Sequence, residues 1–195
     1  MKYLLSQLKN LKNSPLKKVV EKRIKEFEND GKGSEETLFD ELCFCLMTAN
    51  FSATGALKIQ KENGQGFIDL SLDSLSKELK KLGYRFPNAR AKYIVDARAV
   101  LGKIRKNIFK KTRKESREWL RRIKGLGMKE SSHFLRNVGF KDVAIIYRHI
   151  LTILFENEFI SDQKLTTKRY THIERILENI GKKVDLDLAR LDLYI

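Results

Sequence analysis

The fold is decided by one stretch of the chain, Trp119-Leu120-Arg121-Arg122-Ile123-Lys124-Gly125-Leu126-Gly127-Met128-Lys129-Glu130-Ser131-Ser132. Apolar spacing and polar caps predict one helix over 115–123 and another over 128–138. Between them two glycines flank Leu126, and glycine permits positive φ and close approach of the backbone. We expect Leu126 to anchor this turn in the core. The stretch therefore predicts two helices joined by a tight hairpin.

The hairpin has a chemical use as well as a structural one. Amides at the start of the following helix can hold a phosphate, helped by the helix dipole, and Lys124 adds positive charge beside them. A Gly-Leu-Gly sequence by itself is usually only a turn between helices. In a basic chain, with a lysine two positions after Gly127, the pattern favours a DNA-binding hairpin.

Lys129 is the candidate nucleophile. It falls in the first turn of the second helix, where the positive end of the dipole disfavours a charged amine. A neutral amine can attack C1′ of a sugar and form a Schiff base. The alternative is an exposed lysine that binds phosphate, and the chemistry of the residue alone leaves both open.

The rest of the chain also carries the sequence signals that begin and end helices. Only two prolines and few alternating apolar patterns argue against sheets. Serines and Pro87 mark helix starts, and the remaining predicted helices begin at Ser14-Pro15 or cover 34–47, 52–62, 71–82, 87–100, 147–157, 167–180 and 186 to the end. The sequence therefore predicts an all-α protein.

Composition limits the partners and the compartment. Of 195 residues, 40 are Lys or Arg and 25 are Asp or Glu, giving a formal charge of +15, which favours a polyanionic partner. A solvated basic surface, as in thermophiles, is the alternative. The longest apolar run, 42–47, cannot span a bilayer, and no signal peptide is visible at the start. We expect a cytoplasmic protein that makes no membrane contact.

The sequence offers no metal site. Cys43 and Cys45 lie too close together for a zinc knuckle and are too few for an iron–sulfur cluster, so buried, reduced thiols are expected. The three histidines, His133, His149 and His172, are too scattered to form a ligand set.

Several blocks together resemble the archaeal-type 8-oxoguanine DNA glycosylase/AP lyases, which belong to the helix-hairpin-helix glycosylase superfamily. The resemblance covers nearly the whole chain. The blocks that carry it are Leu46–Ala53, Gly83–Phe86, Arg90-Ala91, Tyr93-Ile94, Lys124–Glu130, Ser132–Gly139, Arg148–Ile150 and Leu191–Tyr194.

The resemblance implies two helical lobes with a DNA-binding groove between them. One lobe, a helical barrel that ends in the hairpin, would cover 31–134, and the other would combine 1–30 with 135–195. The partner would be duplex DNA that contains 8-oxoguanine or an abasic site, bound by a monomer associated with the nucleoid. The family requires no cofactor, although a monovalent cation at the hairpin is compatible with it.

The resemblance also implies roles for individual residues. Lys129 matches the Schiff-base lysine, and Lys124, Gly125, Leu126 and Gly127 match the phosphate-binding hairpin. The flipped-out nucleotide leaves a gap that Asn50 and Phe51 would fill, and Phe86 would form an aromatic wall of the base pocket. Alternatives are a helix C-cap for Asn50 and core positions for Phe51 and Phe86.

Two features depart from the family pattern. The family has an aspartate immediately before Arg148, where this chain has Tyr147, and a neutral phenol cannot stabilise positive charge on the sugar as a carboxylate does. No other carboxylate is expected near that position, because Asp142 is five residues too early. The family also continues beyond the Leu191–Tyr194 block, whereas this sequence ends at Ile195.

The sequence therefore supports two functions. The first is excision of 8-oxoguanine followed by β-elimination through Lys129, weakened by Tyr147 and the short C-terminus. The alternative is a damaged-DNA-binding protein that is noncatalytic or acts only as a lyase. A general RNA-binding protein is disfavoured, because the aromatic platforms expected for it are missing.

Overall fold

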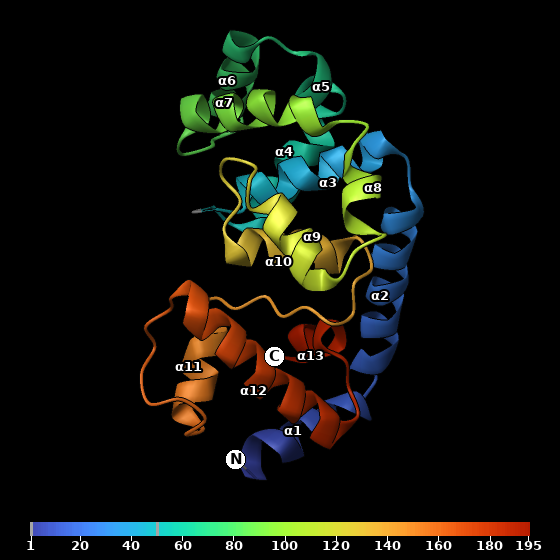
Figure 1. Cartoon of the computed structure of the whole chain (residues 1–195), viewed down its shortest axis with the longest axis vertical. Helices are drawn as coiled ribbons and strands as arrows, with labels where there is room; N and C mark the ends of the chain where they lie inside the picture. The colour runs from blue at the N-terminus through green and yellow to red at the C-terminus, as the bar shows by residue number, and fades with distance from the viewer. Residues whose placement is uncertain (1, 50) are drawn as a thin grey trace. The chain divides into compact units, whose positions relative to one another are not determined.

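The structure is a computed structural model that describes residues 2–49 and 51–195. Every regular element in these ranges is a helix, and no strand occurs among them (Figure 1). The all-α prediction is confirmed. None of the described helices is long and apolar enough to cross a membrane.

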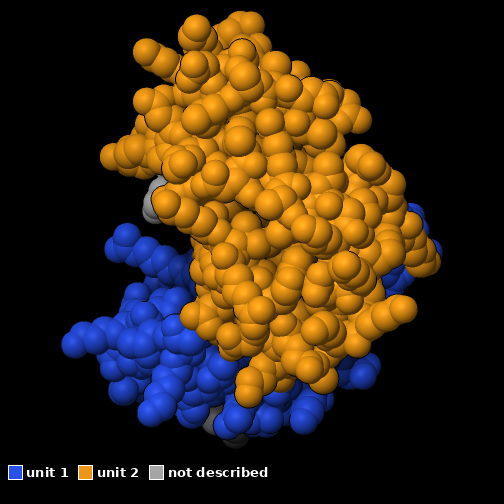
Figure 2. All heavy atoms as spheres, turned by 45° about the horizontal axis from the view of Figure 1, so that its top comes forward, with its two compact units in different colours: residues 1–31, 135–195 blue, residues 32–134 orange. Residues whose placement is uncertain are grey.

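The chain divides into two compact units, coloured separately in Figure 2. Unit 1 combines residues 1–31 with 135–195, and unit 2 covers 32–134. Helices of unit 1 are α1 (Lys2–Lys12), α2 (Leu16–Lys32), α11 (Arg148–Glu156), α12 (Thr167–Val184) and α13 (Leu188–Tyr194). Those of unit 2 are α3 (Glu35–Met47), α4 (Ala53–Asn63), α5 (Gly66–Asp69), α6 (Leu72–Lys81), α7 (Pro87–Ala97), the 3-10 helix η1 (Arg98–Val100), α8 (Ile104–Ile108), α9 (Arg113–Leu120) and most of α10 (Met128–Asn137). The division of the chain into lobes that bind DNA between them stays a prediction.

Side-chain caps explain where the predicted helices begin. The hydroxyls of Ser34, Ser52 and Ser71 each accept a hydrogen bond from the backbone N–H three residues later. Thr112 and Glu115 form a complete capping box at the start of α9. Each serine is therefore the N-cap of its helix, and the helix itself begins one position after the start that the sequence predicted.

Helix α3 forms the centre of unit 2. It is buried almost all round, from Leu38 and Phe39 through Leu42–Met47. Cys43 and Cys45 are buried within it and form no disulfide, and burial raises the pKa of the Cys43 thiol well above its usual value. The prediction of buried, reduced cysteines is confirmed, and an un-ionised thiol is chemically inert.

The sequence analysis predicted no helix at α1, α5 or α8. In α5, four residues that include Gly66 carry too little periodicity to reveal a helix. At α8 the backbone N–H groups of Ile104 and Arg105 donate to the Glu35 carboxylate, at 3.1 and 3.0 Å. This cap comes from a residue far away in the sequence, so local pattern could not predict it.

Candidate active site

The hairpin is formed as predicted. The Leu126 N–H donates to the Ile123 carbonyl at 3.1 Å, and the Leu126 side chain is 5% exposed, so it anchors the turn in unit 2. Gly125 has φ +100°, a region that favours glycine. A Cβ at Gly125 would lie 2.7 Å from Cδ2 of Tyr93 and 2.9 Å from Cδ2 of Leu46. Both the conformation and the space therefore require glycine at this position.

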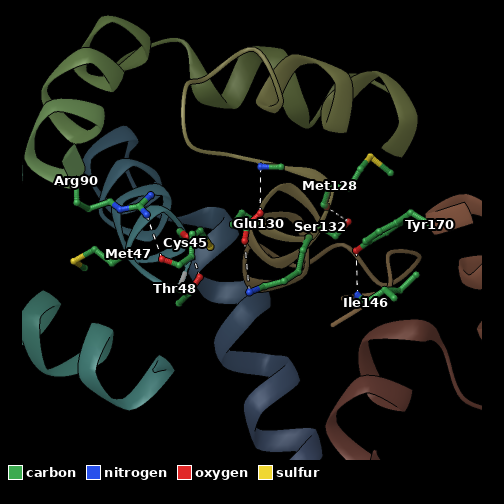
Figure 3. A network of polar contacts seen from close by, with 12 residues as sticks. Cys45, Met47, Thr48, Arg90, Met128, Glu130, Ser132, Ile146 and Tyr170 are labelled. Carbon is green, nitrogen blue, oxygen red and sulfur yellow. Dashed lines mark hydrogen bonds and ion pairs between the residues drawn. The ribbon is translucent and has the colours of Figure 1, made fainter. Parts of the chain in front are cut away.

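Glu130 organises the start of α10 (Figure 3). The Gly127 N–H donates to Oε2 of Glu130 at 3.2 Å, and the Ser132 hydroxyl donates to the Met128 carbonyl at 2.8 Å. Glu130 thus occupies one of the hairpin amides that the sequence assigned to a phosphate. Sequence analysis missed this residue, although a glutamate three positions after a helix N-cap is a known capping pattern.

Lys129 lies in the first turn of α10, as predicted. Its side chain is 31% exposed, and Nζ is 3.5 Å from Oε1 of Glu130. The carboxylate is a counter-charge for the ammonium, which the sequence argument from the helix dipole did not include. Lys129 therefore combines an accessible amine with an adjacent carboxylate.

The region predicted to fill the gap and line the base pocket is also in unit 2. The Phe51 ring lies 4.6 Å from the Tyr84 ring, and the Tyr84 hydroxyl donates to the Met47 carbonyl at 2.8 Å. Phe86 is 46% exposed, with the Arg85 guanidinium 5.0 Å from its ring centre. Phe51 is half-buried, so neither phenylalanine is a fully buried core residue. Asn50 lies outside the described residues.

In unit 1 the backbone before Tyr147 is held by two buried side chains of α12. The Tyr170 hydroxyl donates to the Ala144 carbonyl at 2.7 Å and accepts from the Ile146 N–H at 3.1 Å, a bond drawn in Figure 3. Glu174 accepts from the Ala144 N–H at 3.0 Å. These bonds satisfy backbone groups of an extended segment that has no neighbouring strand, and they fix the path of the backbone into Tyr147.

Tyr147 itself is 37% exposed and occupies the N-cap position of α11, where its side chain makes no capping bond. Partial burial raises the pKa of the Tyr147 phenol above its usual value, the charge of Asp192 raises it further, and Arg136 opposes both. The phenol is therefore neutral near pH 7, as the sequence predicted.

The expectation that no carboxylate lies near Tyr147 was wrong. Asp192 on α13 is close enough to act on the Tyr147 phenol electrostatically, and its Oδ2 lies 3.6 Å from Nη1 of Arg136. Burial raises the pKa of Asp192 above its usual value despite that guanidinium. Asp192 and Arg136 both occur in blocks that carry the family resemblance, but only the fold of unit 1 places them beside residue 147.

Among the described residues, no group of three or more His, Cys, Asp and Glu side chains is arranged to hold a metal ion.

Comparison with known proteins agrees with this arrangement. Residues 20–186 match the family model described as 8-oxoguanine DNA glycosylase. The chain is 50% identical to the 8-oxoguanine DNA glycosylase/AP lyase of Methanocaldococcus jannaschii, over 98% of this chain and 94% of that protein. It is 41% identical to the protein of the same name from Thermotoga maritima, over 100% and 95% of the two chains.

Solved structures give the same result. The M. jannaschii 8-oxoguanine glycosylase/lyase in complex with a 15mer DNA that contains 8-oxoguanine matches with a TM-score of 0.94 and 48% identity. That match covers 98% of this chain and 94% of the other. The Thermotoga maritima 8-oxoguanine DNA glycosylase matches with a TM-score of 0.94 and 40% identity, over 99% and 94% of the two chains. This chain therefore belongs to the 8-oxoguanine DNA glycosylase family.

Proposed function

We propose that this protein acts in base-excision repair, by removing 8-oxoguanine from duplex DNA and cleaving the strand at the abasic site through Lys129. The observation that carries the proposal is the accessible Lys129 amine, in the first turn of a helix that directly follows a well-formed hairpin. Relatives that share the fold and are named 8-oxoguanine DNA glycosylase/AP lyase support it.

The chemistry follows from the amine. Lys129 Nζ attacks C1′ of the flipped-out nucleotide, the glycosidic bond breaks, and the base leaves with the bonding electrons and takes up a proton. The amine loses a proton, for which Glu130 is the nearest acceptor, and the sugar ring opens to a Schiff base. Loss of a C2′ proton then expels the 3′ phosphate by β-elimination. Hydrolysis of the Schiff base frees Lys129.

The hairpin holds the DNA backbone while this occurs. Lys124 is exposed and supplies positive charge beside the turn of Gly125, Leu126 and Gly127. Because Glu130 caps the Gly127 N–H, the phosphate takes the neighbouring amides of the turn and the start of α10. Backbone carbonyls of the hairpin offer ligands to a monovalent cation, and no other cofactor takes part in the proposed reaction. The protein binds as a monomer to duplexes with 8-oxoguanine or an abasic site.

A second function is favoured by one observation, the neutral phenol of Tyr147. Base excision needs negative charge near the sugar as the glycosidic bond breaks, whereas a preformed abasic site has already lost its base. Schiff-base formation at such a site needs only the amine and the hairpin. The second candidate is therefore a protein that acts chiefly as a lyase.

Borohydride trapping distinguishes these functions. The protein is mixed with one duplex that carries 8-oxoguanine and another that carries a preformed abasic site, and covalent adducts are counted after reduction. Lys129→Gln is the test variant. Lys92→Gln, which removes an exposed lysine of the same unit, is the matched control.

Adducts on both duplexes that disappear only in Lys129→Gln support the glycosylase with lyase activity. Adducts on the abasic duplex alone support the second candidate. Trapping that is absent from both duplexes, or that survives in Lys129→Gln, would contradict the proposed function.

A further inference from the structure

Arg90 of α7 is a buried cation in unit 2, with only 6% of its surface exposed. Its Nη2 donates to the Ala49 carbonyl at 3.2 Å, just after the end of α3 (Figure 3). Nε and Nη1 have no hydrogen-bond partner among the described residues. Burying a guanidinium with unfilled donors costs free energy, so such a residue needs a reason beyond packing.

The guanidinium also contacts the hairpin. Arg90 lies over two aromatic rings, with Cζ 5.9 Å from the centre of Tyr84 and 5.3 Å from that of Tyr93. Tyr93 is the ring that a Cβ at Gly125 would strike, and Nη1 of Arg90 lies 3.4 Å from the same Cβ position. Lys124 Nζ lies over Tyr93, 5.4 Å from its centre. Arg90 therefore packs directly beneath the phosphate-binding turn.

The other end of this contact network consists of Met47, Ala49 and Phe51. The Tyr84 hydroxyl donates to the Met47 carbonyl at 2.8 Å and lies 3.4 Å from the Ala49 carbonyl, while the Tyr84 ring packs against Phe51. Arg90 donates to the same Ala49 carbonyl at 3.2 Å. The backbone carbonyls after α3 are thus fixed by Arg90 and Tyr84 together.

We propose that Arg90 is a positioning residue that holds the Ala49 carbonyl, just after α3, in a fixed register with the hairpin. This inference rests on the proposed function, because Asn50 and Phe51, which follow Ala49, are expected to fill the gap left by the flipped nucleotide. With the register fixed, the hairpin binds the DNA backbone while Asn50 and Phe51 fill the gap. Arg90 therefore determines how strongly the protein prefers a duplex with a gap over an intact duplex.

A lysine cannot replace Arg90 in this role. The planar guanidinium directs one N–H to the Ala49 carbonyl while its Cζ lies over the rings of Tyr84 and Tyr93, whereas an ammonium is a compact point charge. Arg90→Lys keeps the positive charge and loses the shape, so it separates positioning from simple electrostatic attraction for DNA.

Arg98 provides a matched control. It is also an arginine of unit 2 that holds backbone carbonyls, since Nε donates to the Phe67 carbonyl at 2.8 Å and Nη2 to the Leu70 carbonyl at 2.6 Å. One of these carbonyls lies within α5 and the other directly after it, and neither takes part in the hairpin contacts described above. Arg98→Lys therefore reports what the loss of such a contact does to stability alone.

The experiment measures the dissociation constants of two duplexes by fluorescence anisotropy, one intact and one with a tetrahydrofuran abasic analogue, which needs no turnover. The preference is the ratio of the two constants. We expect Arg90→Lys to reduce the preference about tenfold and leave intact-duplex binding nearly unchanged, because one charge-assisted contact is lost and the net charge is kept. Tyr84→Phe, which removes the second contact to the same carbonyls, should act in the same direction. Arg98→Lys should keep the wild-type preference.

The outcomes separate this inference from the proposed function. If Arg90→Lys and Tyr84→Phe both keep the wild-type preference, or if Arg98→Lys loses as much, the positioning role is overturned. Borohydride trapping on the abasic duplex is run beside the binding assay. Trapping in the wild type with no effect of Arg90→Lys would refute only this inference. Absence of both trapping and preference in the wild type would refute the proposed function and this inference with it.

Discussion

The hairpin of unit 2 and the 143–147 segment of unit 1 are both held by side-chain hydrogen bonds, but they present residues of different chemistry. In both, a short stretch of backbone is held by side chains, by the nearby Glu130 in one case and by the distant Tyr170 and Glu174 of α12 in the other. At the hairpin the nucleophile Lys129 follows. At the end of the segment a tyrosine stands where the family resemblance implies an aspartate.

At residue 147, the residues that fix the position of the backbone differ from the side chain that determines the chemistry. The hydrogen bonds that fix residue 147 come from Tyr170 and Glu174, and none of them involves the Tyr147 side chain. The scaffold therefore accepts a change at this position without refolding. A single side chain can alter the reaction while the fold stays the same.

The largest effect is expected from Tyr147→Asp. A carboxylate at this position would stabilise the positive charge that develops as the glycosidic bond breaks, and such groups contribute about 10²- to 10³-fold in rate. Excision of 8-oxoguanine under single-turnover conditions should therefore accelerate by about that factor. Tyr147→Phe, which removes only the hydroxyl, should excise as slowly as the wild type. An unchanged rate in Tyr147→Asp would show that the Tyr147 phenol does not slow the excision of 8-oxoguanine.

The next largest effect concerns the hairpin. Gly125→Ala should lower the free energy of unfolding by about 3 kcal/mol, because it adds both a strained φ and a clash with Tyr93 and Leu46. Gly102→Ala is the control: φ is +77° there, but nothing lies within 4 Å of the added Cβ. It should cost only about 1 kcal/mol. Urea unfolding measures both, and equal losses would show that the hairpin contacts matter little.

The segment of unit 1 is tested by Tyr170→Phe. Losing the hydroxyl leaves the Ile146 N–H and the Ala144 carbonyl without that partner in a buried place, which should cost about 2 kcal/mol. Combined with Tyr147→Asp, it should also reduce the gain in excision, because residue 147 is held less firmly. If the double variant excises as fast as Tyr147→Asp, the Tyr170 hydrogen bonds are not needed to hold residue 147 in position.

The smallest effect is a change in pH dependence. Burial raises the pKa of Asp192 in the folded protein above the value of 3.8 expected when unfolded. The folded state then binds the proton more tightly, so the contribution of Asp192 to stability falls as pH rises from 3.8 through the raised folded value. Asp192→Asn should lose less melting temperature over that interval than the wild type does. If the melting temperatures of Asp192→Asn and of the wild type change with pH in the same way, Arg136 compensates fully for the burial of Asp192.

Much of the fold and of the hairpin could be predicted from the sequence, because the signals are local. Serine and threonine caps, Pro87 and the two hairpin glycines act on their immediate neighbours, and they placed Lys129 in the first turn of α10. The Glu130 cap was equally local and could have been found.

The missed features depend on residues far apart in the chain. Asp192 meets Arg136 and affects Tyr147 only after α13 has packed within unit 1, and Glu35 caps α8 across most of unit 2. The contact of Arg90 with the Ala49 carbonyl is of the same kind. Periodicity and capping rules contain no information about such pairs, so only the folded structure reveals them.

The central claim is that Lys129 is the amine that reacts with DNA. The most direct test digests the borohydride-reduced adduct formed with an abasic duplex and identifies the modified peptide by mass spectrometry. We predict that the sugar remnant is attached to Nζ of Lys129. Attachment to Lys124 or to another lysine would contradict the account, because the hairpin would then bind DNA without placing Lys129 of α10 next to the damaged sugar.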